Sequence, residues 1–426
     1  MIKMKLQKIL NRFQKLSSKK VEDLNLKNIR RLLSKLGNPQ DQINCIQICG
    51  SNGKGSTAAF CHSILKEANF KCNVYTSPSV LKVNERFIYN DEMISDENLL
   101  DLLIEVDTVN QGQPLTYYEY LTAAFFLGCK KFKDNIVILE FGLFARADAG
   151  NVLKKNLANI ISSISVDHLS WLPENDRTIE RIIYEKTSAL LNSNIIVAKQ
   201  SSNEIVECIK KNLLNNTGNK IFFNEDYSFT TNESDYFNYK DKFGSVKIPR
   251  PSMKGEFQLE NASNAIATLR ILKQLNIKDE HIIRGIPKAH NTARLEEIKS
   301  GKIKNLVPNN TLIVDTTHNP GGAKVLNDYI RSINFDVHGI IGMMNDKNHE
   351  EYIGYLNNFK SVSVIDIPNN PNAIKGKDLK DKFKVFPNVT YKGTVENAIK
   401  SLDLKENDVV IITGSIYLAG EILKIN

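Results

Sequence analysis

A short glycine-rich segment carries the residues of this chain that are best suited to holding a phosphate group. Residues 50–56 read GSNGKGS and lie between an apolar run and a segment with helical periodicity. In such a turn the backbone N–H groups can close on an anion, the dipole of the following helix favours negative charge, and Lys54 adds a point charge. A hydroxyl from Ser56 or Thr57 could then hold Mg²⁺. The candidate phosphate-binding residues are Gly50, Ser51, Asn52, Gly53, Lys54, Gly55, Ser56 and Thr57.

This segment departs from the standard phosphate-binding pattern at two positions. Ile48 stands where that pattern has its first glycine, and Gly55 stands where it has Ser or Thr directly after the lysine. A glycine-rich turn that merely joins a strand to a helix is an equal alternative on this segment alone. Other segments of the chain must decide between the two.

Polar side chains follow two further apolar segments that we expect to be strands. Glu140 ends the apolar run 135–140, and Asp167 and His168 end the run 160–166. An acid at the carboxyl end of a parallel strand would face the phosphate site, and its hard oxygen ligands suit Mg²⁺. A histidine beside an aspartate at a strand end is a candidate metal ligand, although a lone histidine there is more often structural. These positions predict a metal site.

Apolar periodicity predicts the elements that position these residues. Helices are expected over the apolar stripes at residues 6–16 and 26–36 and from the glycine-rich segment to residue 68, with a second short strand over 72–76. Residues 200–250 are rich in Asn, Lys and Ser and are predicted to form hairpins or loops. In the last third, four strands with intervening helices are expected, three of them ending near residues 315, 342 and 413, and they imply a small doubly wound sheet.

Composition limits the class of protein. The chain has 426 residues, 42% of them hydrophobic and 24% charged, which is ordinary for soluble proteins and long enough for two or three domains. No apolar run approaches the roughly 20 residues that a membrane span needs. A net charge of +8 suits anionic ligands, but the abundance of Lys throughout the chain explains it equally well. No Arg-rich patch with interleaved aromatic residues indicates nucleic acid.

The cysteines and the N-terminal segment indicate where the protein works. Six cysteines are scattered through apolar segments without CxxC pairs, so we expect reduced core residues and a cytoplasmic protein. Residues 1–21 contain no acid, which is compatible with an organellar transit peptide. A stripe of Leu6, Ile9, Leu10 and Phe13 instead favours a first structural helix.

Blocks of sequence from Leu24 to Glu421 resemble, in consistent order, the folylpolyglutamate synthase family of the Mur ligase superfamily. The resemblance rests on GSNGKGS, on the segment 76–88 with Asn-Glu-Arg, on the helix 116–125, and on Thr-Thr-His-Asn-Pro after the run 311–315. It implies an α/β fold in which residues 1–290 form a P-loop Mur-ligase-type ATPase domain and residues 291–426 a Rossmann-like domain. The active site would lie in the cleft between them.

The resemblance also implies roles for particular residues. The implied catalytic residues are Lys54, Lys186, His318 and Arg294, and Lys186 stands where the family has a lysine that can be carbamylated. The implied ATP-binding residues beyond the glycine-rich segment are Asn261, Arg294 and Asp315. The implied ligands of two Mg²⁺ ions are Ser56, Glu140 and His168. The implied substrate-binding residues are Ser77, Pro78, Asn84, Glu85, Arg86, Glu119, Arg146 and Asp148.

The chain departs from the family pattern near the expected acceptor pocket. Ser79 replaces a histidine, Phe144 and Ala145 replace two glycines, Gly150 replaces a threonine, and the Pro-Gly before Arg294 is lost. Phe144 and Ala145 place side chains where the family's backbone approaches a ligand, whereas the lost Pro-Gly lies at the expected hinge between the domains. The identity of the acceptor is therefore the least constrained part of the prediction.

The implied activity is ATP-dependent ligation of L-glutamate to a folate or dihydropteroate carboxylate through an acyl phosphate, with dihydrofolate synthase activity as well. ATP and Mg²⁺ are the implied cofactors, and the enzyme is expected to be a monomer that binds neither nucleic acid nor membranes. Three alternatives remain. They are a Mur-type amide ligase with another acceptor, a P-loop kinase or ATPase that needs no amino acid, and a nucleotide-binding module without activity.

Overall fold

The computed structural model describes the whole chain except residues 16–24, 232–233, 384–385 and 387. The described residues form two compact units, which we call the first and the second unit. The first unit comprises Met1–Ile164, Leu169–Ser252 and Gln258–His290, and the second comprises Ser165–His168, Met253–Phe257 and Asn291–Asn426. No helix in the described part of the chain has the length and apolar character needed to cross a lipid bilayer.

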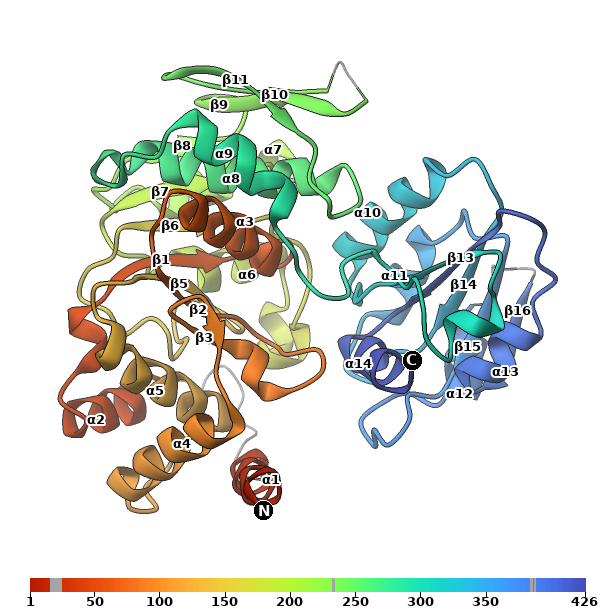
Figure 1. Cartoon of the computed structure of the whole chain (residues 1–426), viewed down its shortest axis with the longest axis horizontal. Coiled ribbons are helices and arrows are strands. Elements are labelled where there is room, and N and C mark those ends of the chain that lie inside the picture. The colour runs from red at the N-terminus through yellow and green to blue at the C-terminus, as the bar shows by residue number, and fades with distance from the viewer. Residues whose placement is uncertain (16–24, 232–233, 384–385, 387) are drawn as a thin grey trace. The chain divides into compact units, whose positions relative to one another are not determined.

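An eight-stranded sheet forms the centre of the first unit, with strand order β4-β3-β2-β5-β1-β6-β7-β8 (Figure 1). The strands from β2 to β8 in this order run parallel, whereas β3 and β4 pair antiparallel at one edge. The central strands are buried along their length, as expected for parallel strands covered on both faces. The strands are β1 (Asn44–Cys49), β2 (Cys72–Tyr75), β3 (Phe87–Tyr89), β4 (Glu92–Met93), β5 (Ile136–Glu140), β6 (Ala158–Ile161), β7 (Asn194–Val197) and β8 (Lys220–Phe222).

Helices and a small antiparallel sheet complete the first unit. The helices are α1 (Ile2–Gln14), α2 (Lys27–Lys35), α3 (Lys54–Glu67), α4 (Asp96–Asn110), α5 (Tyr117–Cys129), α6 (Ile179–Thr187), α7 (Asn203–Asn212), α8 (Phe257–Ile271) and α9 (Asp279–Gly285). The small sheet contains β9 (Tyr227–Thr230), β10 (Tyr236–Asp241) and β11 (Gly244–Pro249). Helices α3 and α9 pack closely, because a Cβ on Gly285 would lie only 2.7 Å from the Cα of Ile64.

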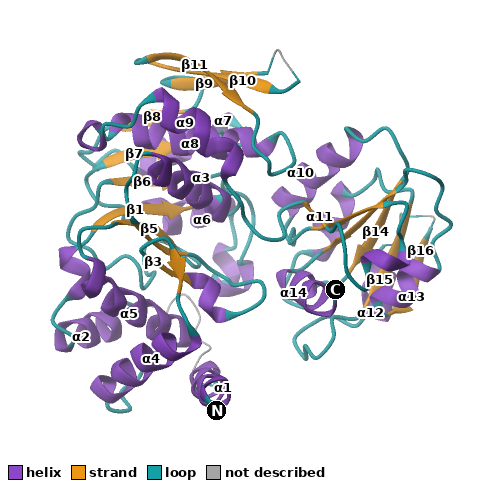
Figure 2. Ribbon diagram, viewed as in Figure 1, coloured by secondary structure: helices purple, strands orange, loops and turns teal. Residues whose placement is uncertain are grey.

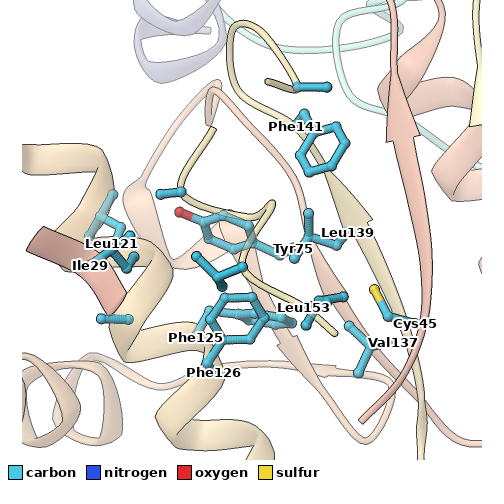
Figure 3. Packing of buried hydrophobic residues seen from close by; sticks show 14 of the residues in the cluster. Ile29, Cys45, Tyr75, Leu121, Phe125, Phe126, Val137, Leu139, Phe141 and Leu153 are labelled. Carbon is cyan, nitrogen blue, oxygen red and sulfur yellow. The ribbon is translucent and has the colours of Figure 1, made fainter. Parts of the chain in front are cut away.

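An aromatic cluster joins α5 to the sheet (Figure 3). Tyr75 of β2 stacks on Phe125 of α5 with 4.9 Å between the ring centroids, and both side chains are fully buried. Phe13 of α1 stacks on Tyr120 at 3.7 Å, which ties the first helix to the same core. The predicted structural helix at the N-terminus is therefore present over Ile2–Gln14.

A six-stranded sheet forms the second unit, with order β12-β13-β17-β14-β15-β16 (Figure 2). All neighbouring strands run parallel except β12 and β13. The strands are β12 (Glu296–Glu297), β13 (Thr311–Val314), β14 (Val337–Ile341), β15 (Ser361–Ile365), β16 (Val389–Gly393) and β17 (Val409–Thr413). The helices are α10 (Pro320–Arg331), α11 (His349–Tyr355), α12 (Gly376–Lys382), α13 (Val395–Lys400) and α14 (Ile416–Ile425). The predicted α/β fold class is confirmed.

Three predicted elements were wrong in extent. The strand expected over 160–166 ends at Ile161, because the chain then turns to hydrogen-bond the glycine-rich segment through Ser163. Residues 200–250 contain helix α7 in addition to strands, since Ile205, Val206 and Ile209 provide an apolar stripe that the abundant Asn and Lys obscure. The second unit has six strands rather than four, because the edge strands are short or partly exposed.

Candidate active site

The glycine-rich segment is a turn held tightly against the strand next to it. A Cβ on Gly50 would lie 2.1 Å from Ser162 Oγ, and Gly50 has a positive φ of 130°. The backbone N–H groups of Ser51 and Asn52 both donate to the carbonyl of Ser163, at 2.9 and 3.0 Å. Only glycine fits such a close approach at this φ, so the sequence at position 50 follows from the geometry.

Gly53 ends the turn and begins helix α3. Its φ of 86° is left-handed, and a Cβ there would lie 2.2 Å from Asn261 Oδ1. Asn261 also donates through Nδ2 to Gln258 Oε1 at 3.0 Å, so α8 places an amide directly against the turn. Strand, glycine-rich turn and helix N-terminus thus follow one another as expected of a phosphate-binding loop.

Lys54 and Glu140 lie together at the carboxyl ends of neighbouring strands. The register of β1 and β5 places Ile48 opposite Glu140, and Lys54 Nζ lies 3.8 Å from Glu140 Oε1. Lys54 Nζ also donates to the carbonyls of Gly50 and Ser51 at 3.2 Å each. The acid predicted from the end of an apolar run therefore faces the phosphate-binding loop.

Buried hydroxyl groups occur in the first turn of helix α3 and next to Glu140. Within the described residues, Thr57 Oγ1 and Ser77 Oγ are buried and have no hydrogen-bond partner. The backbone N–H of Ser77 donates to Glu140 Oε2 at 3.2 Å, which places that hydroxyl near the acid, and Ser56 is buried as well. Hydroxyl and carboxylate oxygens are the donors that Mg²⁺ prefers, and the hydroxyls of Thr57 and Ser77 have no other partner among the described residues, so the residues present fit this metal.

Lys186 joins the glycine-rich turn to the loop of residues 142–151. Its ammonium is 1% exposed and donates to the carbonyls of Gly50 and Leu143, at 2.8 and 2.9 Å. It also lies 5.4 Å from the centroid of the Phe144 ring, a cation–π contact. The phenylalanine that replaces a family glycine therefore packs beside this lysine.

Two residues predicted to bind substrate instead maintain the loop of residues 142–151. Buried Asp148 accepts from the N–H groups of Gly142, Leu143 and Gly150, at 2.8, 3.3 and 2.8 Å. Arg146 donates through Nε and Nη2 to the two carboxylate oxygens of Glu185, at 2.8 and 3.0 Å. These contacts hold the loop in place, and substrate contact by Arg146 and Asp148 stays a prediction.

The protonation of Asp148 should give this loop a measurable pH dependence. Burial raises the pKa of Asp148 to about 6, although the N–H bonds to its carboxylate oppose this shift. The folded protein then holds the proton more tightly than the unfolded chain, so the contribution of this group to stability falls as the pH rises from about 4 to 6, by roughly 3 kcal/mol.

Asp148→Asn removes this titration, and we expect the wild-type Tm to fall relative to that of the variant as the pH rises through this window. Thermal unfolding of both proteins between pH 4 and 7 measures the effect. Parallel Tm profiles would show that Asp148 does not titrate there.

The three residues of the Asn-Glu-Arg segment, Asn84, Glu85 and Arg86, have different surroundings. Glu85 accepts from the N–H groups of Val80, Leu81 and Lys82 at 2.9 to 3.1 Å. Asn84 Nδ2 donates to the Ile94 carbonyl and to Asp96 Oδ1, at 3.0 Å each. Both residues therefore shape the loop that follows the Ser77-Pro78 bond, which is cis.

Arg86 differs from its two neighbours. Its side chain is nearly buried, yet Nε and Nη1 have no hydrogen-bond partner among the residues that the structure describes. The guanidinium carbon lies 5.9 Å from the centroid of the Tyr117 ring. A buried cation with unpaired N–H groups is costly unless an anion completes it, so Arg86 is a candidate anion-binding residue.

Glu119 is one of the implied substrate-binding residues. It is a buried acid within an apolar helix, and such an acid needs a partner. The partner is its own helix N-terminus: Thr116 Oγ1 accepts from the N–H of Glu119 at 3.2 Å, and Glu119 Oε2 accepts from the N–H of Thr116 at 2.8 Å. This reciprocal capping box accounts for the buried acid. The capping box supplies the partner that a buried acid needs, and contact of Glu119 with substrate stays a prediction.

In the second unit, polar side chains gather around Asp167. Asn319 Nδ2 and Lys347 Nζ donate to its carboxylate at 3.0 and 3.2 Å, while the Nε2 atoms of His318 and His168 lie 3.7 and 3.5 Å away. Burial alone would raise the pKa of Asp167, but the two histidines and Lys347 hold it well below its usual range. His168 thus belongs to this cluster of the second unit.

Sequence reasoning missed Asp167, Asn319 and Lys347 as members of one group. Asp167 and Lys347 are 180 positions apart, so no short motif contains both residues. A pattern near each residue could still have indicated it. Each follows the carboxyl end of an apolar run, where the polar residues of parallel strands converge.

Asp315 positions the segment that contains Arg294. Its carboxylate accepts from the N–H groups of Leu295 and Thr317, at 3.0 and 2.7 Å. Ala293 and Leu295, on either side of Arg294, have positive φ angles of 55° and 49°. The partly exposed Arg294 is therefore presented from a turn that Asp315 fixes.

Comparisons with known proteins agree with the resemblance predicted from the sequence blocks. Residues 294–416 match the model described as "Mur ligase, glutamate ligase domain". The chain is 29% identical to a dihydrofolate synthase/folylpolyglutamate synthase of Bacillus subtilis (strain 168), and the similarity covers 94% of each protein. The predicted resemblance to this family is thus confirmed over almost the whole length of the chain.

Solved structures share the fold. E. coli FolC in complex with DHPP and ADP superposes with a TM-score of 0.84 at 24% identity, covering 99% of this chain and 97% of that one. A bifunctional folylpolyglutamate synthase/dihydrofolate synthase from Yersinia pestis, complexed with AMPPNP and a Mn ion, superposes with a TM-score of 0.86 at 23% identity, covering 98% and 97%. Both are built from the same arrangement of elements as this chain.

Proposed function

We propose that this chain is an ATP-dependent ligase of the folylpolyglutamate synthase and dihydrofolate synthase family, and that it joins L-glutamate to the carboxylate of a folate or of dihydropteroate. The observation that carries the proposal is the pairing of Lys54 with Glu140 at the ends of β1 and β5, on a glycine-rich loop. A match to a glutamate ligase domain over residues 294–416 supports it.

The chemistry requires activation of the carboxylate. A carboxylate is a poor electrophile because its leaving group would be oxide, so the γ-phosphoryl group of ATP is first transferred to it. The glutamate amine then attacks the carbonyl carbon of this acyl phosphate, loses a proton and expels inorganic phosphate to leave an amide. Lys54 is placed to neutralise charge on the phosphates during the first step.

Ser56 and Glu140 would hold Mg²⁺, and His168 remains a proposed ligand for a second ion. When bound, Mg²⁺ supplies electrostatic stabilisation of the phosphate oxygens. Asn261 packs against the loop, where it could contact the nucleotide. Arg294 and Asp315 of the second unit are proposed for ATP on the family resemblance, and Arg294, His318 and Lys186 are proposed as catalytic residues on the same ground.

Arg86 is the residue that we propose for the acceptor's negative charge. The Arg86 guanidinium lies close enough to Tyr75 and Tyr118 to oppose the rise that burial causes in the pKa of each phenol, so it belongs to a partly polar region beside the aromatic cluster. A pteridine-bearing acid offers both an aromatic ring and a carboxylate to such a region. Ser77 and Pro78 border it from the preceding loop.

Arg86→Met should weaken acceptor binding without weakening the fold. Loss of a charged hydrogen bond to the acceptor is expected to raise the acceptor KM by about 10- to 100-fold. The Tm should stay the same or rise, because the variant removes a desolvated cation with unpaired N–H groups. Steady-state kinetics and thermal unfolding measure the two effects.

Arg30→Met, on the exposed face of α2, is the matched control and should change neither quantity. An unchanged acceptor KM in Arg86→Met would remove Arg86 from the binding site. A large fall in Tm would show that the side chain supports the fold instead.

The activity is tested by measuring ADP release from ATP, Mg²⁺ and L-glutamate, with dihydropteroate in one reaction and tetrahydrofolate in another. Turnover that needs both glutamate and an acceptor supports the ligase, and the responding reaction identifies the substrate. ADP formation without an amino acid would instead support a kinase or ATPase. If neither reaction releases ADP although ATP is bound, a Mur-type ligase with another acceptor is favoured. Phe144 and Ala145, which replace two family glycines, would then account for the different acceptor.

A further inference from the structure

Three side chains with metal-binding atoms meet on the first unit, at a group that the proposed ligase reaction does not use. His62 comes from the middle of helix α3, Cys72 begins strand β2, and Asp91 lies in the turn between β3 and β4. One ligand atom of each lies within 4.8 Å of the other two. These segments are distant enough in sequence that only the fold brings them together.

Backbone and side-chain hydrogen bonds hold this group in place. The N–H of Asp91 donates to the carbonyl of Cys72 at 3.0 Å, and the N–H of Cys72 donates to Asp91 Oδ1 at 3.1 Å. His62 Nε2 lies 3.0 Å from the same oxygen. Asp91 itself has a left-handed φ of 70°, so the turn is shaped to direct its carboxylate toward β2 and α3.

A hydrogen bond between His62 Nε2 and Asp91 Oδ1 explains part of this arrangement. It does not involve two further potential metal ligands, Asp91 Oδ2 and the Cys72 thiol. Asp91 Oδ2 is buried and has no hydrogen-bond partner among the described residues. Lys71 Nζ approaches it to 3.1 Å without meeting hydrogen-bond geometry, and the Lys71 side chain is 58% exposed and can turn into solvent. The thiol of Cys72 is fully buried and forms no disulfide.

We propose that His62, Cys72 and Asp91 form a binding site for a divalent cation of the zinc class, separate from the nucleotide. An imidazole nitrogen, a thiolate sulfur and a carboxylate oxygen are the donors that Zn²⁺ takes, whereas Mg²⁺ disfavours a sulfur ligand. Binding replaces the S–H bond of Cys72 with a metal–sulfur bond and releases the proton to solvent. The His62 side chain is 19% exposed, so water on that side can complete a four-coordinate ion.

Such an ion would stabilise the two ends of the loop of residues 76–86, which contains Arg86. Strands β2 and β3 bracket residues 76–86, and the site joins the start of β2 and the turn after β3 to helix α3. Helix α3 begins at Lys54 in the glycine-rich loop. The cation would therefore link the nucleotide-binding helix to the acceptor loop as a structural tie.

The test measures zinc bound to the full-length protein by equilibrium dialysis and metal analysis, with Mg²⁺ and ADP in excess to occupy the nucleotide site. We expect about one zinc ion per wild-type chain. Cys72→Ser and Asp91→Asn should weaken binding by at least about 10- to 100-fold, which is what loss of even an outer partner of a metal ligand costs. Cys208→Ser removes a partly exposed cysteine on α7 and is the matched control, which should bind zinc as the wild type does.

Cobalt substitution gives a second measurement, the absorption of a bond between Co²⁺ and the Cys72 thiolate, which can be made on the wild-type protein itself. Co²⁺ should produce a thiolate charge-transfer band in the wild type and in Cys208→Ser, and none in Cys72→Ser. If Cys72→Ser fails to fold by circular dichroism, His62→Gln on the partly exposed side of α3 replaces it. Absence of zinc from the wild type, or zinc binding unchanged in Cys72→Ser or His62→Gln, overturns the site. Neither result depends on ligase activity.

Discussion

Lys54→Ala is expected to abolish ligation while leaving the protein folded. The Lys54 ammonium lies 3.8 Å from Glu140 Oε1, and its hydrogen bonds to the carbonyls of Gly50 and Ser51 stay within the glycine-rich loop. Removing a preorganised charge that stabilises a developing phosphoryl transition state costs at least about 10²- to 10³-fold in rate. ADP release under saturating ATP, glutamate and acceptor measures the loss.

Lys66→Ala is the control for this experiment, because Lys66 is exposed in the last turn of the same helix. Both variants should unfold near the wild-type Tm. Wild-type rates of ADP formation by Lys54→Ala would contradict the assignment of the loop to ATP, and with it the proposed function.

Asp167→Ala is expected to give the largest loss of stability among the predicted variants. Asp167 is the shared acceptor for Asn319 and Lys347 and lies beside two histidines. Without it Lys347, whose side chain is only 12% exposed, loses its buried counter-charge. Removing one partner of a buried ion pair typically costs about 3–5 kcal/mol. Urea unfolding followed by circular dichroism measures the change in the free energy of unfolding.

Asp328→Ala, on an exposed position of helix α10, is the comparison for this variant. Its ion pair with Arg331 is solvent-exposed and worth less than about 1 kcal/mol. If Asp167→Ala were as stable as Asp328→Ala, the cluster around Asp167 would have no structural role.

Features that depend on local sequence could be predicted. The glycine-rich turn, the helix that begins at Lys54 and the acid that ends β5 all follow from short patterns whose physical basis lies within about ten residues. The parallel arrangement of the strands then brings Lys54 and Glu140 together. The fold class followed from the same alternation of apolar runs and helical periods.

Features that depend on distant partners could not be predicted. Glu185 pairs with Arg146 across 39 positions, and nothing near either residue indicates this contact. The side chains of Asn84, Glu85 and Asp148 bond mainly to backbone, which a sequence motif cannot distinguish from contact with a ligand. Glu119 is different, because Thr116 three residues earlier is a local signal for a capping box and could have identified its role.

The position of Lys186 restricts the chemistry available to its side chain. Its ammonium donates to the carbonyls of Gly50 and Leu143, so both neighbours are hydrogen-bond acceptors. A carbamate formed on Nζ from carbon dioxide keeps one N–H and adds two acceptor oxygens, so it can donate to only one of these two carbonyls. Uptake of carbon dioxide by this amine would therefore cost at least one of the two hydrogen bonds that join the turn at Gly50 to the loop at Leu143.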